Sequence, residues 1–321
     1  MERRKFIKNV TLGSAVLPGL MFGLDSCRRT GVAGQQTATD LRQYDPTLRD
    51  RLWMWGHVAS TINGRYNIPA GNNIDMADAI DCMGIPNVCV IRWGGMPEPP
   101  FDEFIKQFHK TKRVAWSILA IDDIDGKGDC VSHSFAQKKQ WAFELREKMP
   151  NLVSFYLDDY FHYVREEAQE DSRHELVTLD AIRDLHQEVK SLKQPTDLSM
   201  VIYSDALRDI GPGIKPHLDN CDVVSFWTWY ATNLTALKDN FRNYREIVPD
   251  KPTLLGIYMW DFGNSKPIPL EMMKLQLDFA LEKFERHEIE GMIFHCTPLV
   301  GLGLEAVEYA KKWIAEHGDV T

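Results

Sequence analysis

From residue 51 onward the chain alternates short β-rich apolar runs with amphipathic stretches, and this alternation constrains the fold more than any other feature. There are eight such runs: Leu52–His57, Val88–Trp93, Val114–Ile121, Val153–Asp159, Leu198–Asp205, Val223–Trp229, Leu254–Asp261 and Met292–Thr297. Helical periodicity follows in the stretches Asp75–Met83, Phe101–Lys110, Ser134–Lys148, Glu175–Leu192, Leu234–Tyr244, Leu270–His287 and Leu304–Glu316. A repeated order of strand and helix predicts a parallel sheet covered by helices.

Eight units in about 270 residues predict a single domain over residues 51–321, with the α/β fold of a (β/α)8 TIM barrel. The fifth connection departs from the repeat, because Asp209–Pro216 holds two glycines and two prolines and cannot form a long helix. A degenerate fifth helix is therefore expected. A doubly wound open sheet is the alternative, but no GxGxxG turn follows the first run.

Residues 1–26 have the character of an export signal. The charged segment Arg3-Arg4-Lys5-Phe6-Ile7-Lys8 precedes the apolar stretch Val10–Leu24. This pattern resembles the bacterial twin-arginine signal, which implies a location in the periplasm or cell envelope. A single membrane anchor is the alternative, although the stretch is shorter than the roughly 20 residues that span a bilayer.

The segment Leu24-Asp25-Ser26-Cys27 resembles a lipoprotein cleavage site, except that Asp25 stands where that motif usually has a small residue. A lipid on Cys27 would be the protein's contact with a membrane, and both a lipidated and a free mature chain remain open. Residues 27–50 form a polar lead-in to the domain. The net charge of −9 argues against a nucleic-acid partner, because phosphate binding needs a basic surface.

Five further cysteines, Cys82, Cys89, Cys130, Cys221 and Cys296, are irregularly spaced and favour buried free thiols. A Cys82–Cys89 bridge is the alternative. No CxxC or HxxxH pair is present, so the sequence predicts neither a metal site nor a cofactor.

Alternation along each run indicates which side chains face the barrel interior. In the fourth run the apolar positions 153, 155 and 157 should meet the helices, so Ser154, Tyr156 and Asp158 point inward. Arg92 points inward if Cys89 and Ile91 face outward. The same reasoning places a larger set inside, near the carboxyl ends of the strands: Trp55, His57, Tyr203, Asp205, Trp227, Trp229, Tyr258, Trp260 and His295.

Aromatic side chains around carboxylates and imidazoles suit a carbohydrate ligand. The C–H faces of a sugar pack on aromatic rings, while its hydroxyls need convergent polar partners. The same rings could form a cage for a quaternary ammonium ion, or simply fill the barrel core.

Glycoside hydrolysis usually needs two carboxyl groups, and Asp158 and Asp205 end neighbouring strands. We expect Asp158 to donate the proton, with its pKa raised by Tyr156 and nearby rings, and Asp205 to be its partner. Asp159 and Asp261 are substitutes for either role. Alternatively, Asp158-Asp159 caps the next segment or pairs with Arg92 or Arg165.

Over nearly its whole mature length the chain resembles the TIM-barrel glycoside hydrolases. Phe155-Tyr156-Leu157-Asp158-Asp159-Tyr160 is similar to the acidic fourth-strand motif of the chitinase-like families, Asp-x-x-Asp-x-Asp-x-Glu, but lacks its final Glu. The resemblance implies that Asp158 is the proton donor. Gly256–Gly263 also resembles a segment of an uncharacterised exported bacterial family, which implies no known activity.

The leading hypothesis is an exported enzyme that hydrolyses a glycosidic bond. A non-catalytic barrel that binds glycans is the second hypothesis, and a binder of a cationic small molecule is the third.

Overall fold

The computed structural model describes residues 43–119, 133–161, 164 and 178–321. Its eight strands are β1 (Leu52–Gly56), β2 (Asn87–Val90), β3 (Arg113–Leu119), β4 (Leu152–Leu157), β5 (Asp197–Tyr203), β6 (Val223–Trp227), β7 (Thr253–Tyr258) and β8 (Gly291–His295). Each strand pairs in parallel with its neighbours in the sequence, and β1 pairs with β8 to close the barrel. The predicted (β/α)8 barrel is confirmed. The export signal, Cys27 and Cys130 lie outside the described residues.

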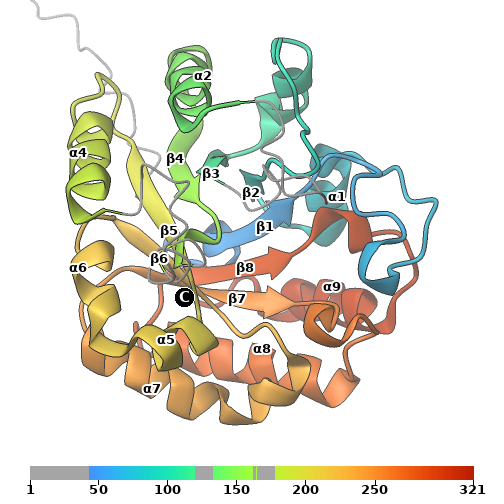
Figure 1. Cartoon of the computed structure of the whole chain (residues 1–321). Helices are drawn as coiled ribbons and strands as arrows, with labels where there is room; N and C mark the ends of the chain where they lie inside the picture. Colours follow the sequence, from blue (N-terminus) through green and yellow to red (C-terminus); the bar gives the residue numbers. More distant parts are fainter. Residues whose placement is uncertain (1–42, 120–132, 162–163, 165–177) are drawn as a thin grey trace, which may run out of the picture. The chain divides into compact units, whose positions relative to one another are not determined.

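Helices surround the strands (Figure 1). They are α1 (Met76–Met83), α2 (Phe135–Lys148), α4 (Leu179–Lys190), α5 (Ser204–Ile210), α6 (Lys215–Leu218), α7 (Leu237–Ile247), α8 (Leu270–Glu285) and α9 (Glu305–His317). Short 3-10 segments are η1 (Arg49–Arg51), η2 (Arg65–Asn67), η3 (Phe104–Lys110), η5 (Gly211–Ile214), η6 (Ala231–Ala236), η7 (Phe262–Asn264) and η8 (Thr297–Leu299).

The connection after β5 has no long helix. The short helix α5 ends at Ile210, before Gly211 with its positive φ of 61°, and η5 and α6 follow with a proline near the start of each. This confirms the degenerate fifth helix. Two predicted elements differ in the structure. The strand β5 ends at Tyr203, so Asp205 lies in the first turn of α5 instead of at the strand end. The helix predicted near Phe101–Lys110 is the 3-10 segment η3.

Local sequence explains where the regular helices begin and end. Ser134 forms a capping box with Gln137 at the start of α2, which satisfies backbone N–H groups that have no partner inside the helix. Gly84 ends α1 with φ 68°, a conformation that costs glycine little because it has no Cβ. Phe155 of β4 stacks on Phe143 of α2 with ring centroids 5.4 Å apart, so the outward face of this strand meets a helix as predicted.

The interior of the barrel is filled by inward side chains of successive strands. Ser154 of β4 and Ser199 of β5 hydrogen-bond across the interior, with 2.7 Å between their hydroxyl oxygens. Trp227 of β6 donates its indole N–H to Ser225 at 2.9 Å and lies over Gly256 of β7. A Cβ on Gly256 would be 2.1 Å from Cε3 of Trp227, so glycine at this position makes room for the indole.

The end of the barrel at the strand N-termini is closed by a buried ion pair. Arg113 of β3 donates to both carboxylate oxygens of Asp50, at 3.0 and 2.9 Å, and to the backbone oxygen of Gln43 at 2.8 Å. Its guanidinium carbon lies 4.5 Å from the centre of the Tyr44 ring. Asn87 of β2 donates to the backbone oxygens of Asp50 and Leu52 beside this pair. Both members of the ion pair are buried.

Asn87 therefore faces inward, and with it Cys89, whose thiol meets the Tyr156 hydroxyl. The condition for an inward Arg92, an outward Cys89, is therefore not met, and in this short and almost wholly apolar strand the alternation left the direction open. Cys89, Cys221 and Cys296 are buried free thiols, and no Cys82–Cys89 bridge is formed. Cys82, in contrast, is exposed.

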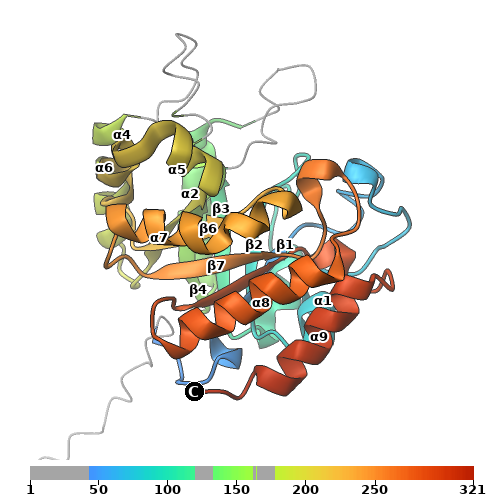
Figure 2. The same ribbon diagram turned by 90° about the horizontal axis from the view of Figure 1, so that it is seen from below.

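The two ends of the described barrel meet. The backbone N–H groups of Leu48 and Arg49 donate to the carbonyl oxygens of Val320 (2.8 Å) and Gly318 (2.6 Å). The C-terminus lies beside the blue N-terminal segment of the barrel in Figure 2. Within the described parts of the chain, no helix has the length and apolar character needed to cross a membrane.

Candidate active site

A cavity of about 250 Å³ opens at the carboxyl ends of the strands, where TIM barrels carry their chemistry. The cavity is lined by aromatic rings, three carboxylates and two imidazoles. Its described lining residues are Trp55, His57, Ile62, Tyr66, Trp93, Asp158, Asp159, Phe161, Tyr203, Asp205, Ala206, Trp227, Trp229, Tyr258, Phe262 and His295.

Three of the four carboxylates predicted from the sequence reach this cavity. Asp158 follows the last residue of β4, is 6% exposed, and is fixed by its backbone N–H, which donates to the carbonyl oxygen of Leu119 at 2.9 Å. Asp159 comes next, in a left-handed conformation with φ 51°. Asp205 enters from α5, where its carboxylate accepts from the N–H of Ala206 at 3.0 Å. A buried carboxyl beside two more exposed ones suits proton transfer.

Two tyrosines face the carboxylates. Burial, followed by the negative charge of Asp159, raises the pKa of Tyr203 well above its usual value, and Asp158 adds to this effect. Burial also raises the pKa of Tyr258, and the charges of Asp159 and Asp158 act in the same direction. Both phenols therefore keep their protons and remain hydrogen-bond donors to the carboxylates or to a ligand hydroxyl.

Both histidines of the cavity are neutral. Burial lowers the pKa of His57 to about 3. Burial, with a smaller contribution from His57, lowers the pKa of His295 well below its usual value. The imidazoles thus contribute hydrogen-bonding or ligating nitrogens and no positive charge, and the net charge of the described cavity lining comes from its carboxylates.

Most of the predicted aromatic side chains line the cavity, and further aromatic residues join them. Trp55 lies edge-on to Trp227 at 5.3 Å between ring centroids, and Trp227 lies 5.1 Å from Tyr258. Trp229 contacts Tyr258 at 5.8 Å. The sequence reasoning missed Tyr66, Trp93 and Phe262, which lie beyond the ends of strands or in connecting segments, where the alternation of a strand no longer indicates direction.

Four predicted site residues do not line the cavity. Asp261 is buried and accepts hydrogen bonds from the N–H groups of Ala231 and Asn264, so it holds the turn after β7 together. The indole N–H of Trp260 donates to the carbonyl oxygen of Tyr66 at 3.0 Å. Both residues follow the end of β7 at Tyr258, so the alternation of inward and outward side chains along the strand does not apply to them.

The other two are Arg92 and Tyr156. Arg92 donates to the carbonyl oxygen of Pro97 at 2.7 Å and pairs with Glu98, because β2 ends at Val90 and the chain then turns away. Tyr156 does face the interior, but it lies deeper in the barrel, edge-on to Trp55 with ring centroids 5.5 Å apart.

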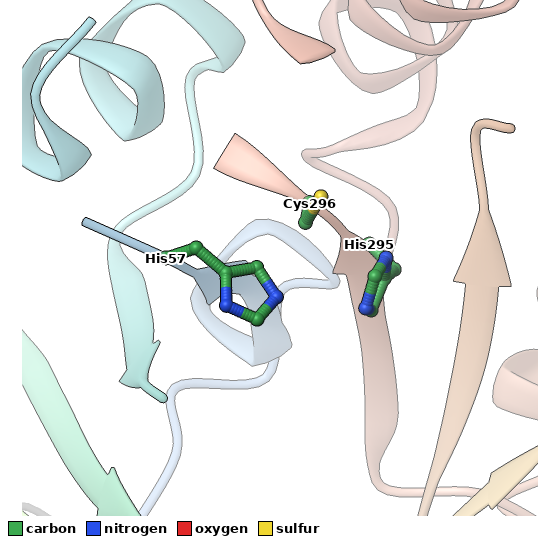
Figure 3. Close-up of side chains that lie close together, drawn as sticks. All are labelled: His57, His295 and Cys296. Atoms are coloured by element: carbon green, nitrogen blue, oxygen red, sulfur yellow. The ribbon is translucent and has the colours of Figure 1, made fainter. Parts of the chain in front are cut away.

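His57, His295 and Cys296 lie together at the side of the cavity formed by β1 and β8 (Figure 3). One potential ligand atom from each lies within 4.8 Å of the other two. The sequence predicted no metal site, because the rule of short spacings cannot detect residues that the barrel closure brings together from opposite ends of the chain.

No protein-family model matches the chain, and no curated protein sequence matches it. Among solved structures, the chain is similar to the catalytic domain of a hyperthermophilic chitinase from Pyrococcus furiosus, with 14% sequence identity and a TM-score of 0.50 over 84% of this chain and 97% of that one. It is also similar to a GH99 endo-alpha-mannosidase from Bacteroides thetaiotaomicron, with 8% identity and a TM-score of 0.51 over 86% and 98%.

The fold is a TIM barrel like theirs. At these identities the likeness concerns the fold, and the chemistry of this chain must be argued from its own residues.

Proposed function

We propose that the protein is an exported glycoside hydrolase that uses Asp158 as the proton donor. The observation that carries this proposal is the position of Asp158, which is buried and lies in one cavity with Asp159, Asp205 and a ring of aromatic side chains. The barrel fold shared with a chitinase and an endo-mannosidase supports a carbohydrate ligand.

The mechanism follows from the two kinds of side chain in the cavity. The aromatic faces of Trp229 and Trp227 pack against the C–H face of a sugar, while Tyr203 and Tyr258 donate to its hydroxyls. Asp158, poorly solvated, gives its proton to the departing glycosidic oxygen. A second carboxylate, Asp205, attacks the sugar or activates a water molecule, with Asp159 as the alternative for this role.

Hydrolysis of a panel of aryl glycosides tests the proposal. We expect Asp158→Asn to lower kcat by about 10²–10⁴-fold, the usual contribution of a general acid. The matched control is Asp219→Asn, which removes an exposed carboxylate that is paired with Lys215 and does not line the cavity. Circular dichroism confirms that each variant is folded. Full activity of Asp158→Asn would remove this residue from the mechanism.

The second carboxylate can be identified with an external nucleophile. If Asp205 forms a covalent intermediate, azide restores turnover to Asp205→Gly and forms a glycosyl azide, whereas Asp159→Gly is not rescued. Rescue of Asp159→Gly alone would exchange the two roles.

If the wild-type protein hydrolyses no glycoside but still binds glycans, the non-catalytic alternative is favoured. In that case affinity electrophoresis on immobilised glycans should show retention by the wild type and its loss in Trp229→Ala. Trp141→Ala is the matched control, because Trp141 on α2 is also half-buried and does not line the cavity. If no glycan retains the wild-type protein and no aryl glycoside is hydrolysed, both carbohydrate hypotheses are contradicted. A cationic small molecule is then the ligand to test.

Export is part of the proposal and rests on the N-terminal sequence. Replacement of Arg3 and Arg4 by lysine should leave the precursor in the cytoplasm, as measured by fractionation and immunoblotting. Cys27→Ser should release the protein from membranes if that cysteine is lipidated. A precursor that is still processed after the double replacement would contradict the twin-arginine assignment.

A further inference from the structure

The cluster of His57, His295 and Cys296 is held in place by the closure of the barrel. Trp55 of β1 pairs with His295 of β8, and His57 follows two residues later. Thr297 ties the two segments together, because its hydroxyl accepts from the N–H of His57 at 3.0 Å and lies 3.2 Å from the carbonyl oxygen of the same residue. The backbone segments that carry these three side chains are therefore held together by strand pairing and by the hydrogen bonds of Thr297.

The imidazoles of this cluster lack the partners that buried histidines normally have. Nδ1 of His57 and Nδ1 of His295 are buried, and neither has a hydrogen-bond partner among the described residues. His57 is 3% exposed, so bulk water does not supply the missing contacts. Leaving a buried polar atom unsatisfied costs about 1–3 kcal/mol. In Figure 3 the ring nitrogen of His57 on the side of His295 is Nε2, so Nε2 is the atom with which His57 would hold an ion in this cluster.

We infer that His57, His295 and Cys296 bind one divalent transition-metal ion of the zinc type at the side of the cavity. Imidazole nitrogen and thiolate sulfur are the ligands that Zn²⁺ prefers, and three protein ligands with an open fourth position form the pattern of reactive zinc sites. Figure 3 shows the ring of His57 directed toward His295, with Cys296 beside them. This inference goes beyond hydrolysis and does not depend on it.

Charge and packing around the cluster agree with a bound cation. On binding, the Cys296 thiol gives its proton to solvent and the sulfur lone pair forms the bond to the metal. A thiolate and a divalent ion together carry one positive charge, which the carboxylate of Asp159 in the same cavity offsets. Phe262, with its ring centroid 4.5 Å from that of His295, and Trp55, stacked at 6.0 Å, hold the imidazole in place.

The open coordination position would face the cavity, because His57 and His295 both line it. A water molecule or a sugar hydroxyl is the natural fourth ligand. The competing interpretation is that the imidazoles bind sugar hydroxyls directly and no ion is involved, and the metal content of the protein separates the two.

The test uses the full-length mature protein, treated with a chelator and titrated with Co²⁺, which reports thiolate ligation by a charge-transfer absorption band in the near ultraviolet. We expect about one Co²⁺ per chain with that band, and about one Zn²⁺ per chain by elemental analysis after incubation with Zn²⁺ and desalting. Cys296→Ser should abolish the band, and His57→Ala should weaken metal binding at least about 10-fold.

Matched controls separate this site from adventitious binding. Cys221→Ser removes another buried thiol, one that donates to the carbonyl oxygen of Leu218, and His217→Ala removes a histidine on α6; both should keep the band. Asp158→Asn should also keep it, so failure of the hydrolase proposal and failure of the metal site are distinguishable. His57→Gln, which retains a polar side chain, replaces His57→Ala if the latter does not fold.

Wild-type protein without a Co²⁺ thiolate band, or a band that survives in Cys296→Ser, would overturn the inference. So would metal binding of equal affinity in the wild type and in folded His57 variants.

Discussion

Replacing Gly256 by alanine would push a methyl group into the ring of Trp227. The added Cβ would lie 2.1 Å from Cε3 and 2.2 Å from Cδ2 of the indole, whereas ordinary contacts begin near 3.4 Å. The ring would have to move by about 1.3 Å, and it cannot move freely because it is buried between Trp55 and Tyr258 and hydrogen-bonded to Ser225.

Overpacking of this kind costs about 1–3 kcal/mol. With an unfolding entropy of about 2.1 cal/mol/K per residue, the loss corresponds to a decrease in Tm of about 2–5 °C for a domain of about 280 residues. Because Trp227 lines the cavity, we also expect weaker ligand binding and an altered near-ultraviolet circular dichroism spectrum. Urea titration followed by far-ultraviolet circular dichroism measures the free energy of unfolding.

Gly213→Ala is the matched control, since Gly213 lies in η5 away from the cavity and a Cβ there would be 3.2 Å from Cγ2 of Ile210. Its effect should be small. Adding Trp227→Leu to Gly256→Ala should cost less than the sum of the two single changes by about 0.5–3 kcal/mol, because the new methyl group then enters vacated space. Additive losses would refute the claim that Gly256 exists to accommodate this indole.

Three further predictions concern stability. Asp50→Asn removes the charge that faces the buried Arg113 guanidinium and should lower the free energy of unfolding in urea by about 3–5 kcal/mol, whereas Asp45→Asn, at an exposed pair, should change it by less than about 1 kcal/mol. Burial alone would raise the pKa of Asp50, but hydrogen bonds from Arg113 and Lys112 outweigh it and lower that pKa. This stabilisation is therefore complete above the usual Asp pKa of 3.8 and lost as the pH falls through the lowered value, so Asp50→Asn should flatten the acid limb of a stability–pH curve, and an unchanged limb would contradict the assignment. Ser134→Ala, which breaks the capping box of α2, should cost about 1 kcal/mol in thermal unfolding monitored by calorimetry.

The sequence predicts the barrel well because its signal is repeated eight times. Each strand must be apolar toward the helices, so alternation in β4 correctly places Phe155 against α2 and Asp158 toward the cavity. Strand boundaries carry less information. The fifth run is predicted to extend to Asp205, which does line the cavity but reaches it from the first turn of α5.

The site is predicted most reliably where a residue lies on a strand. Trp55, Trp227 and His295 lie on strands and line the cavity. Arg92 and Asp261 lie beyond the strand ends, where hydrogen bonds of the turn decide their direction. Tyr66, in the loop after β1, adopts a left-handed conformation with φ 51°, which sequence alternation cannot foresee.

The hydrogen bonds between Leu48–Arg49 and Gly318–Val320 join the beginning and the end of the barrel. Arg49 reinforces them, since its guanidinium reaches the carbonyl oxygens of Gly84 and Ile314 and the carboxylate of Asp319. A short linker from Thr321 to residue 43 would therefore turn the barrel into a continuous ring that can be reopened at another surface loop. In such a circular permutant the new termini lie at the chosen loop and can carry a reporter there. The eight strands keep the same neighbours in the barrel.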